Sequence, residues 1–372
     1  MDLAPFRLER YFARHEFSAR YLLGCSDCQP LTMSELLEMA QDDTLSMWHS
    51  LSLGYTESQG LPLLRDEIAS LYDAVSADEV VTVVPEEGIF LAMNALLQPG
   101  DHLIATFPGY QSLYGVAQAI GCRVSQWKPR EGADWRFHLD DLMPLLESGT
   151  KLIVVNFPHN PTGATLDSRA WRELVGIAET AGARLFSDEM YRFLEFDPAD
   201  RLPSAAILSD TALSLSGLSK AFALPGLRLG WLTTQDTSLM ERLCTLKDYT
   251  TICGSAPSEM LGLIALRARQ TIVARNLALV RRGCEAFASF FDRHTDRFRW
   301  LPPRAGSVAF PRLLSGDATS LCAGLMQAEG VLVVPGSELD FDDSHFRVGL
   351  GREGVEAGID RFEAYLQHAP RV

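Results

Sequence analysis

The sequence has no surplus of basic residues and no long apolar run. Of its 372 residues, 33 are Lys or Arg and 48 are Asp or Glu, so the formal net charge is −15. Nucleic acids and anionic membranes attract clustered Lys and Arg, and this charge therefore disfavours both as partners. No apolar run approaches the about 18 residues of a membrane span, and residues 1–7 contain no apolar core of the signal-peptide type. We expect a cytoplasmic protein with small-molecule substrates.

Cysteine is scarce and scattered, with seven residues in the chain. Cys25 and Cys28 have the Cys-x-x-Cys spacing of half a metal site or a redox pair. No second pair and no histidine cluster follows, so buried structural thiols are the favoured interpretation and no metal is predicted. An odd number of cysteines also fits a reducing cytoplasm.

The chain is long enough for two or three domains, and its 47% apolar and 22% charged residues are typical of globular proteins. From residue 80, short β-branched runs alternate with helical patterns, which predicts a mostly parallel sheet with helices on both faces. We expect an N-terminal segment belonging to the small domain (1–45), a large domain (46–260) and a smaller α+β C-terminal domain (261–372). The expected strands are 80–84, 102–106, 123–126, 152–156, 184–188, 212–215 and 227–232, and the expected helices between them include 88–97, 111–120 and 169–181.

Polar residues follow three of these strands. Asn156, Asp188 and Ser216 end strands, and Asn160, Tyr191 and Lys220 come shortly after. Ligands of parallel sheets bind beyond the carboxyl ends of the strands. We therefore expect these six side chains to converge on one site.

The stretch 214–231 places Lys220 and Arg228 among small and apolar residues. A desolvated lysine can lose its proton and attack an aldehyde, and the arginine fork suits a phosphate. Together they suggest pyridoxal phosphate held as a Schiff base. A solvated surface lysine is the alternative, but apolar neighbours such as Phe222 and Trp231 favour a buried amine.

Three motifs occur in a fixed order: Asn-Phe-Pro-His-Asn-Pro-Thr-Gly at 156–163, Ser-Asp-Glu-Met-Tyr at 187–191, and Ser-Lys at 219–220 with Arg228. In this order and spacing they resemble the class I/II aminotransferases, which are fold type I pyridoxal phosphate enzymes. The resemblance covers nearly the whole chain. It implies an α/β large domain with a mostly parallel seven-stranded sheet, and a smaller α+β domain.

The resemblance also implies roles around the cofactor ring. Lys220 would form the Schiff base and move the proton, and Asp188 would pair with the ring nitrogen. Asn160 and Tyr191 would bond the phenolic oxygen of the ring, and Tyr110 would stack on it. His159, inside the turn beside Asn160, could serve as a general base, but we favour a turn-packing role.

The remaining implied roles concern the phosphate and the substrate. Arg228 and Ser219 would bind the phosphate, and Tyr55 would reach the phosphate of a neighbouring subunit, which implies a homodimer with composite sites. Arg347 would bind the substrate α-carboxylate as a bidentate pair, near Asn160.

The phosphate cup departs from the family pattern. Residues 84–88 read Val-Pro-Glu-Glu-Gly instead of glycine followed by small or hydroxyl residues, and Gly217 replaces a common Ser or Thr. Pro85 has no N–H to donate. We expect the amides of Glu86 and Glu87 to contact the phosphate; in the competing account the helix start is shifted and the amides of Glu87 and Gly88 act instead.

The resemblance leaves the reaction open. We expect an aminotransferase acting on an L-amino acid. The alternative is elimination and cyclisation of a hydroxyarginine-like substrate, because several segments, such as Glu9-Arg10-Tyr11-Phe12, resemble the capreomycidine synthase subgroup. Glu16 and Asp27 are then candidates to bind a guanidinium, although two solvated acids are the simpler interpretation. A non-catalytic sensor domain is disfavoured because Lys220 is present.

Overall fold

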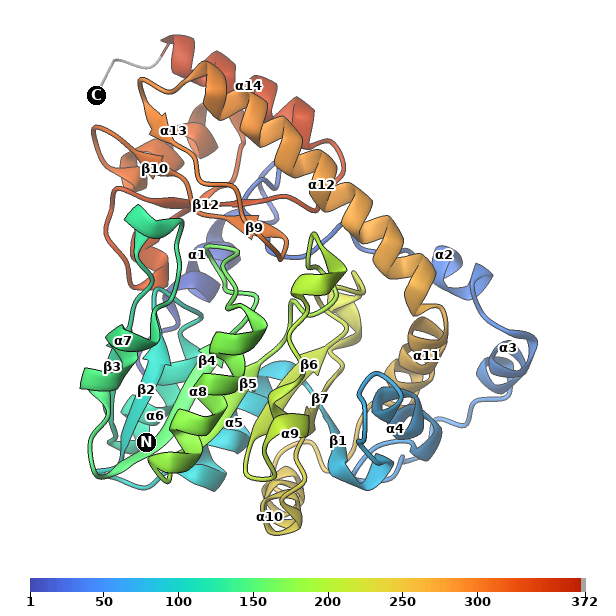
Figure 1. Cartoon of the computed structure of the whole chain (residues 1–372). Helices are drawn as coiled ribbons and strands as arrows, with labels where there is room; N and C mark the ends of the chain where they lie inside the picture. The colour runs from blue at the N-terminus through green and yellow to red at the C-terminus, as the bar shows by residue number, and fades with distance from the viewer. Residues whose placement is uncertain (369–372) are drawn as a thin grey trace.

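The computed structural model describes residues 1–368 and is built on a seven-stranded sheet (Figure 1). The strand order is β1-β7-β6-β5-β4-β2-β3, and every pairing is parallel except the two that β7 makes. The predicted mostly parallel sheet is therefore confirmed. Its strands are β1 (Val80–Val83), β2 (His102–Thr106), β3 (Arg123–Trp127), β4 (Thr150–Asn156), β5 (Arg184–Asp188), β6 (Leu213–Gly217) and β7 (Gly230–Thr233).

Both faces of the sheet are buried under helices, which explains the nearly continuous apolar strands. Side chains alternate along β4, so Leu152 and Val154 enter one core while Ile153 and Val155 enter the other. The first core includes α5 (Pro85–Leu96), α6 (Ser112–Ile120) and α10 (Thr237–Lys247), and the second includes α8 (Ser168–Thr180) and α9 (Ala205–Leu208).

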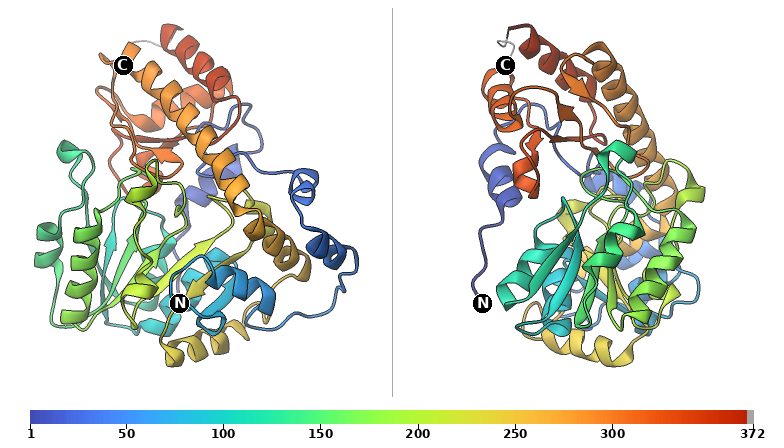
Figure 2. Two further views of the ribbon diagram at one scale, coloured as in Figure 1. Left: turned by 45° about the vertical axis from the view of Figure 1, so that its right-hand side comes forward. Right: turned by 60° about the vertical axis from the view of Figure 1, so that its left-hand side comes forward.

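The C-terminal part is a smaller α+β unit. Figures 1 and 2 show it at one end of the large sheet, with the long helix α12 running toward it from beside α11. Helix α12 contributes an apolar stripe to the core, where Val280, Phe287 and Phe291 are buried. Its elements are α12 (Arg269–Arg293), α13 (Ala318–Glu329), α14 (Val355–His368), the three-stranded sheet β11 (Val334–Pro335), β12 (Phe346–Gly349) and β9 (Val308–Ala309), and the pair β8 (Phe298–Arg299) and β10 (Arg312–Leu313).

The N-terminal segment joins this smaller unit. Tyr21 bridges to Val331, and the amide of Gly349 donates to the carbonyl of Leu23 over 2.7 Å. These contacts attach the segment around residues 21–23 to the smaller unit. We propose a division of the chain into residues 1–45, 46–260 and 261–372. The remaining helices are α1 (Arg7–His15), α2 (Met33–Glu38), α3 (Asp42–His49), α4 (Pro62–Ala69), α7 (Leu139–Leu142) and α11 (Ala256–Arg267).

Two predicted boundaries beside the site were wrong. Helix α5 begins at Pro85 and not at residue 88, because proline is preorganised for the first helical position and acidic residues suit the first turn. Strand β7 begins at Gly230 and not at residue 227, because Pro225–Leu227 forms a 3-10 turn and Arg228 has φ 51°.

Candidate active site

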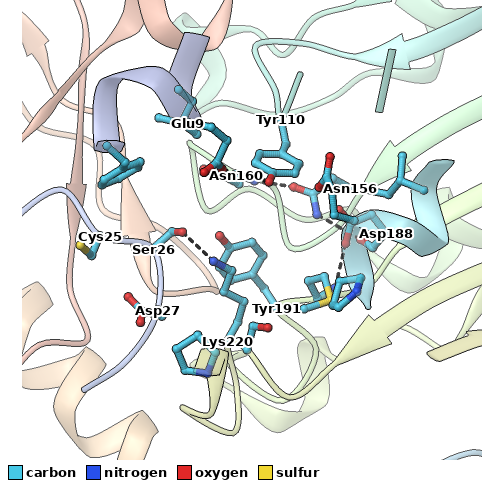
Figure 3. Close-up of a pocket in the computed structure, with 18 of the residues that line it drawn as sticks. Glu9, Cys25, Ser26, Asp27, Tyr110, Asn156, Asn160, Asp188, Tyr191 and Lys220 are labelled. Carbon is cyan, nitrogen blue, oxygen red and sulfur yellow. Dashed lines mark hydrogen bonds between the residues drawn. The ribbon is translucent and has the colours of Figure 1, made fainter. Parts of the chain in front are cut away.

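A cavity of about 520 Å³ lies where the carboxyl ends of β4, β5 and β6 meet the N-terminal segment and β12 (Figure 3). The structure brings together nine of the eleven predicted site residues there, and leaves Glu87 and Tyr55 outside its lining. The nine are Glu86, Tyr110, Asn160, Asp188, Tyr191, Ser219, Lys220, Arg228 and Arg347.

Five of the six polar residues expected after strand ends line this cavity, and Ser216 does not. Its hydroxyl is buried and donates to the carbonyl of Glu189 over 3.5 Å. The reason is the pleat, because Leu215, the preceding residue of β6, points into the cavity and its neighbour must point away.

Asp188, the last residue of β5, is a buried carboxyl on the cavity wall. Burial raises the pKa of Asp188 to about 7, while the Met190 amide, which donates to Oδ1 over 3.0 Å, and the charge of Lys220 act in the opposite direction. Asn156 fixes this strand end by donating from Nδ2 to the Asp188 carbonyl over 3.1 Å. A cationic partner in the cavity would satisfy the buried carboxylate.

Tyr191 and Asn160 present polar groups to the same space. The Tyr191 hydroxyl is buried, and nothing within residues 1–368 forms a hydrogen bond with it. Asn160 is held by its amide N–H, which donates to Asn156 Oδ1 over 2.8 Å, and its side-chain oxygen accepts from Arg347 over 3.2 Å. A buried hydroxyl of this kind normally has a partner, so the site calls for a ligand oxygen here.

Lys220 is half-buried, less than the sequence suggested, because its amine opens onto the cavity. The ε-amine donates to Ser26 Oγ over 2.9 Å (Figure 3). Sequence reasoning missed this contact, since 194 residues separate the two side chains.

Arg347, on β12, is almost fully buried. Nε and one terminal nitrogen donate to the Gly24 carbonyl over 3.3 and 2.9 Å, and the ring of Phe12 lies 5.7 Å from the guanidinium carbon. In the part of the chain that the structure describes, no carboxylate forms an ion pair with it. An unpaired buried cation is costly, so this guanidinium is suited to an anionic ligand.

The backbone amides at the start of α5 decide which groups can bind a phosphate at that end of the cavity. The Gly88 amide is used inside the helix, where it donates to the Val84 carbonyl over 2.9 Å. In this structure the Gly88 amide, which the shifted account needs, is therefore engaged within the helix. The amides of Glu86 and Glu87 remain as the predicted donors at the helix N-terminus. Arg228 is exposed and lines the cavity beside Ser219.

The two acidic side chains at this helix start point in different directions. Glu86 lines the cavity, and burial raises the pKa of its carboxyl, with the hydroxyls of Ser112 and Tyr110 opposing the shift. Glu87 instead accepts from the Val84 amide over 3.3 Å and from the hydroxyls of Thr250 and Thr251. Of these two carboxylates, that of Glu86 faces the cavity and that of Glu87 does not.

Gly217 lacks a hydroxyl for a steric reason. A Cβ at this position would lie 3.0 Å from the Gly230 Cα and 3.1 Å from the Leu229 carbonyl oxygen. A side chain here would therefore press on the backbone of the segment that leads into β7, and glycine avoids this close contact.

Tyr55 is 92% exposed and lies outside the cavity of its own chain. Its loop is nevertheless held at the base, because Lys247 donates to the Ser58 carbonyl and Glu259 accepts from the Leu61 amide over 3.0 Å. An anchored loop that exposes an aromatic side chain is suited to contact another molecule.

Acidic side chains line the side of the cavity formed by the N-terminal segment. Glu16 and Asp27, both predicted, lie there, but Asp27 already forms an ion pair with Arg352 at 2.7 Å. Burial, and then the charge of Asp27, raise the pKa of Glu16. The sequence analysis missed Glu9, which accepts from the Tyr110 hydroxyl over 3.1 Å, because it did not predict α1.

The other titratable candidates, His159, Cys25 and Cys28, are buried. His159 is buried in its turn, where Nδ1 bonds Thr162 Oγ1 over 2.8 Å and burial lowers its pKa to about 3. Cys25 and Cys28 are free buried thiols, and burial raises their pKa values to about 11 and about 12.

Within the described residues, no group of three or more His, Cys, Asp or Glu side chains is arranged to hold a metal ion. None of the helices in residues 1–368 combines the length and apolarity that a membrane crossing requires.

The side chains around the cavity fit pyridoxal phosphate. The cavity offers an amine for an aldehyde (Lys220), a carboxyl for a pyridine nitrogen (Asp188), an unpaired hydroxyl for a phenolic oxygen (Tyr191), and an arginine beside a helix N-terminus for a phosphate (Arg228). The buried Tyr191 hydroxyl is the observation that most needs such a partner.

Comparisons with known proteins agree with this fit. Residues 24–362 match the family model described as aminotransferase class I and II. The chain is 35% identical to capreomycidine synthase of Streptomyces vinaceus over 278 residues (73% of this chain and 70% of that protein), and 28% identical to an aspartate aminotransferase of Pyrococcus horikoshii over 340 residues (84% and 83%).

Solved structures show the same fold over the full length. A PLP-dependent aminotransferase from Streptococcus suis has a TM-score of 0.93 at 28% identity and full coverage of both chains. The PLP-dependent cyclase OrfR has a TM-score of 0.90 at 27% identity, covering 99% of this chain and 98% of that one. The chain therefore belongs to the class I and II aminotransferase family, and its cofactor is pyridoxal phosphate.

Proposed function

We propose that the chain is a pyridoxal-phosphate-dependent aminotransferase that acts on an L-amino acid. The observation that carries this proposal is Arg347, a buried guanidinium with no acidic partner in residues 1–368, on the same cavity as Lys220 and Asp188. A substrate carboxylate would form a bidentate pair with this arginine and so place its α-carbon and amino group in the cavity.

The residues around the cavity then divide the remaining work. Bound pyridoxal phosphate supplies an electron sink for the negative charge that develops at the substrate α-carbon. Asp188 would hold a proton on the ring nitrogen, Tyr191 and Asn160 would hydrogen-bond the phenolic oxygen, and Tyr110 would cover the ring. Lys220 binds the cofactor aldehyde and, when its amine is free, moves the proton at the α-carbon.

The phosphate is bound at the other end of the cavity. Arg228 and Ser219 face this end, and the amides of Glu86 and Glu87 lie at the start of α5. Tyr55 of a second copy of the chain completes the set.

A homodimer is part of the proposal. Support comes from exposed apolar side chains on two adjacent loops, Leu53 and Tyr55 on one, Tyr249 and Ile252 on the other. The loops are joined by the Thr56 hydroxyl, which donates to the Gly254 carbonyl over 3.3 Å. A second copy covering this surface would bury the exposed aromatic rings.

Elimination and cyclisation of a guanidinium amino acid is the second candidate. It is favoured by the 35% identity to capreomycidine synthase and by carboxylates on the cavity wall. Asp27 is neutralised by Arg352, which leaves Glu16, together with Glu9, as the carboxylates facing a substrate side chain.

Product analysis distinguishes the two reactions. The holoenzyme is incubated with a panel of L-amino acids that includes arginine and hydroxyarginine, and products and cofactor are identified by mass spectrometry. Release of a keto acid with formation of pyridoxamine phosphate supports transamination. A product that has lost a hydroxyl, with the cofactor still an aldehyde, supports the second candidate, and no turnover with any amino acid contradicts both.

A further inference from the structure

Ser26 contacts the amine of Lys220, but the proposed function gives Ser26 no role, and its place in the sequence does not predict this contact. Its Oγ lies 2.9 Å from Nζ of Lys220 and accepts a hydrogen bond from it (Figure 3). Ser26 comes from the N-terminal segment, whereas Lys220 follows β6, and both residues line the cavity.

The backbone around Ser26 is fixed independently of Lys220. The Ser307 hydroxyl donates to the Ser26 carbonyl over 2.6 Å, and the Asp27 carboxylate accepts from Arg352 over 2.7 and 2.9 Å. Two residues earlier, the Gly24 carbonyl accepts two hydrogen bonds from the Arg347 guanidinium. The backbone that carries the Ser26 hydroxyl is therefore held in place, whereas Lys220 has a long flexible stem that lets its amine move.

The amine of Lys220 has two chemical states in an enzyme of this kind. When it condenses with the cofactor aldehyde, water leaves and the nitrogen keeps at most one N–H. When it is free, it has two or three N–H groups that need acceptors in a half-buried site. The hydrogen bond to Ser26 therefore stabilises mainly the free amine of Lys220.

We propose that Ser26 is a positioning residue that holds the ε-amine of Lys220 whenever that amine is not bonded to the cofactor. By stabilising the free amine, Ser26 favours release of the lysine when a substrate amine takes its place and opposes its recapture. The proposal rests on the proposed function through the assignment of Lys220 as the cofactor-binding lysine.

Binding of two forms of the cofactor distinguishes this role from a general effect of the substitution on the shape of the cavity. Pyridoxal phosphate uses the Lys220 amine on binding, so it must displace the amine from Ser26. Pyridoxamine phosphate has no aldehyde and leaves Lys220 free, so the contact with Ser26 is kept. Loss of the Ser26 hydroxyl should therefore change the affinity for the first compound and not for the second.

The experiment uses the full chain, stripped of cofactor, as wild type, Ser26→Ala and Ser26→Thr. Equilibrium binding of pyridoxal phosphate and of pyridoxamine phosphate is measured by absorbance and fluorescence. For Ser26→Ala, we expect the Kd of pyridoxal phosphate to fall by about threefold to about tenfold, the size set by one hydrogen bond, and the Kd of pyridoxamine phosphate to stay the same. Ser26→Thr keeps a hydroxyl and should restore the wild-type ratio of the two constants.

Ser18→Ala is the matched control, because Ser18 lies in the same segment and its hydroxyl donates to the His15 carbonyl over 3.0 Å, away from the cavity. It should change neither constant. An unchanged Kd of pyridoxal phosphate in Ser26→Ala, or equal changes for both compounds, would overturn the proposal. The proposal assumes that Lys220 is the lysine that binds the cofactor, and borohydride reduction of the wild-type protein with bound pyridoxal phosphate, followed by peptide mapping, tests this. A label on Lys220 upholds the assignment. A label on another lysine refutes both the assignment and the role of Ser26.

Discussion

Replacing Asp188 by Asn should remove part of the pH dependence of the free energy of unfolding of the cofactor-free protein. The Asp188 carboxyl is buried at the end of β5, and burial raises its pKa from 3.8 to about 7. The folded chain therefore holds this proton at pH values where the unfolded chain has lost it. Stability from this group is greatest below about pH 4 and is lost as the pH rises toward 7.

The size of the effect follows from the shift in pKa. The folded and unfolded pKa values differ by about three units, so between pH 5 and pH 7 the folded chain holds nearly one proton more than the unfolded chain, and this group lowers the free energy of unfolding by about 2 kcal/mol over that range. Asn has a similar shape, keeps an oxygen for the Met190 amide and does not ionise. The free energy of unfolding of Asp188→Asn should therefore fall less than that of wild type between these pH values, by about this amount.

Urea unfolding of both cofactor-free proteins at several pH values measures this difference. Asp167→Asn is the control, since Asp167 is an exposed N-cap of α8 at which Asn caps equally well; it should leave the wild-type pH dependence in place. If wild type and Asp188→Asn lose stability in parallel from pH 5 to pH 8, Asp188 is not the buried acid described here. The same variant, with cofactor bound, should turn over several orders of magnitude more slowly, because the ring nitrogen loses its proton-holding partner.

Three further predictions concern the cofactor site. Lys220→Ala should abolish turnover and the link between cofactor and protein that borohydride reduces; a reducible link that persists in this variant would place the cofactor on another lysine. Mixing inactive Tyr55→Ala with inactive Lys220→Ala should restore part of the activity, because a heterodimer contains one intact site; an active monomer in light scattering would contradict shared sites. Pro85→Ser adds an N–H at the start of α5 and should slow cofactor dissociation, measured by dilution, by about threefold to tenfold; unchanged or faster dissociation would show that the phosphate cup lacks no donor there.

The sequence predicted the large sheet well, because its strands are β-branched runs buried on both faces. β5 was predicted with its observed bounds, and the polar residues after β4 and β5 reach the cavity as expected. Ser216 was the exception, because a prediction that ends β6 two residues early cannot decide which of two neighbouring side chains faces the ligand.

The residues that the N-terminal segment supplies were harder to predict. Helix α1 mixes charged and aromatic side chains, and its buried residues Leu8 and Tyr11 acquire their role only from contacts with distant parts of the chain, as when the Tyr11 hydroxyl donates to the Val333 carbonyl over 2.8 Å. Ser26 likewise meets Lys220 through tertiary folding alone. Local sequence preferences do not predict contacts between distant parts of the chain, so these residues could be identified only from the folded structure.

The central claim is that Arg347 binds the carboxylate of an amino acid in this cavity. The most direct test compares an amino acid with the amine that lacks its carboxylate. Binding of each member of such a pair to the holoenzyme is measured by the spectral change of the cofactor, in wild type and in Arg347→Ala. A bidentate charged pair is worth about 1.5–3 kcal/mol or more. Arg347→Ala should therefore weaken the amino acid by about tenfold to a hundredfold and leave the amine nearly unchanged. Equal losses for both compounds would mean that Arg347 is structural and would contradict the account.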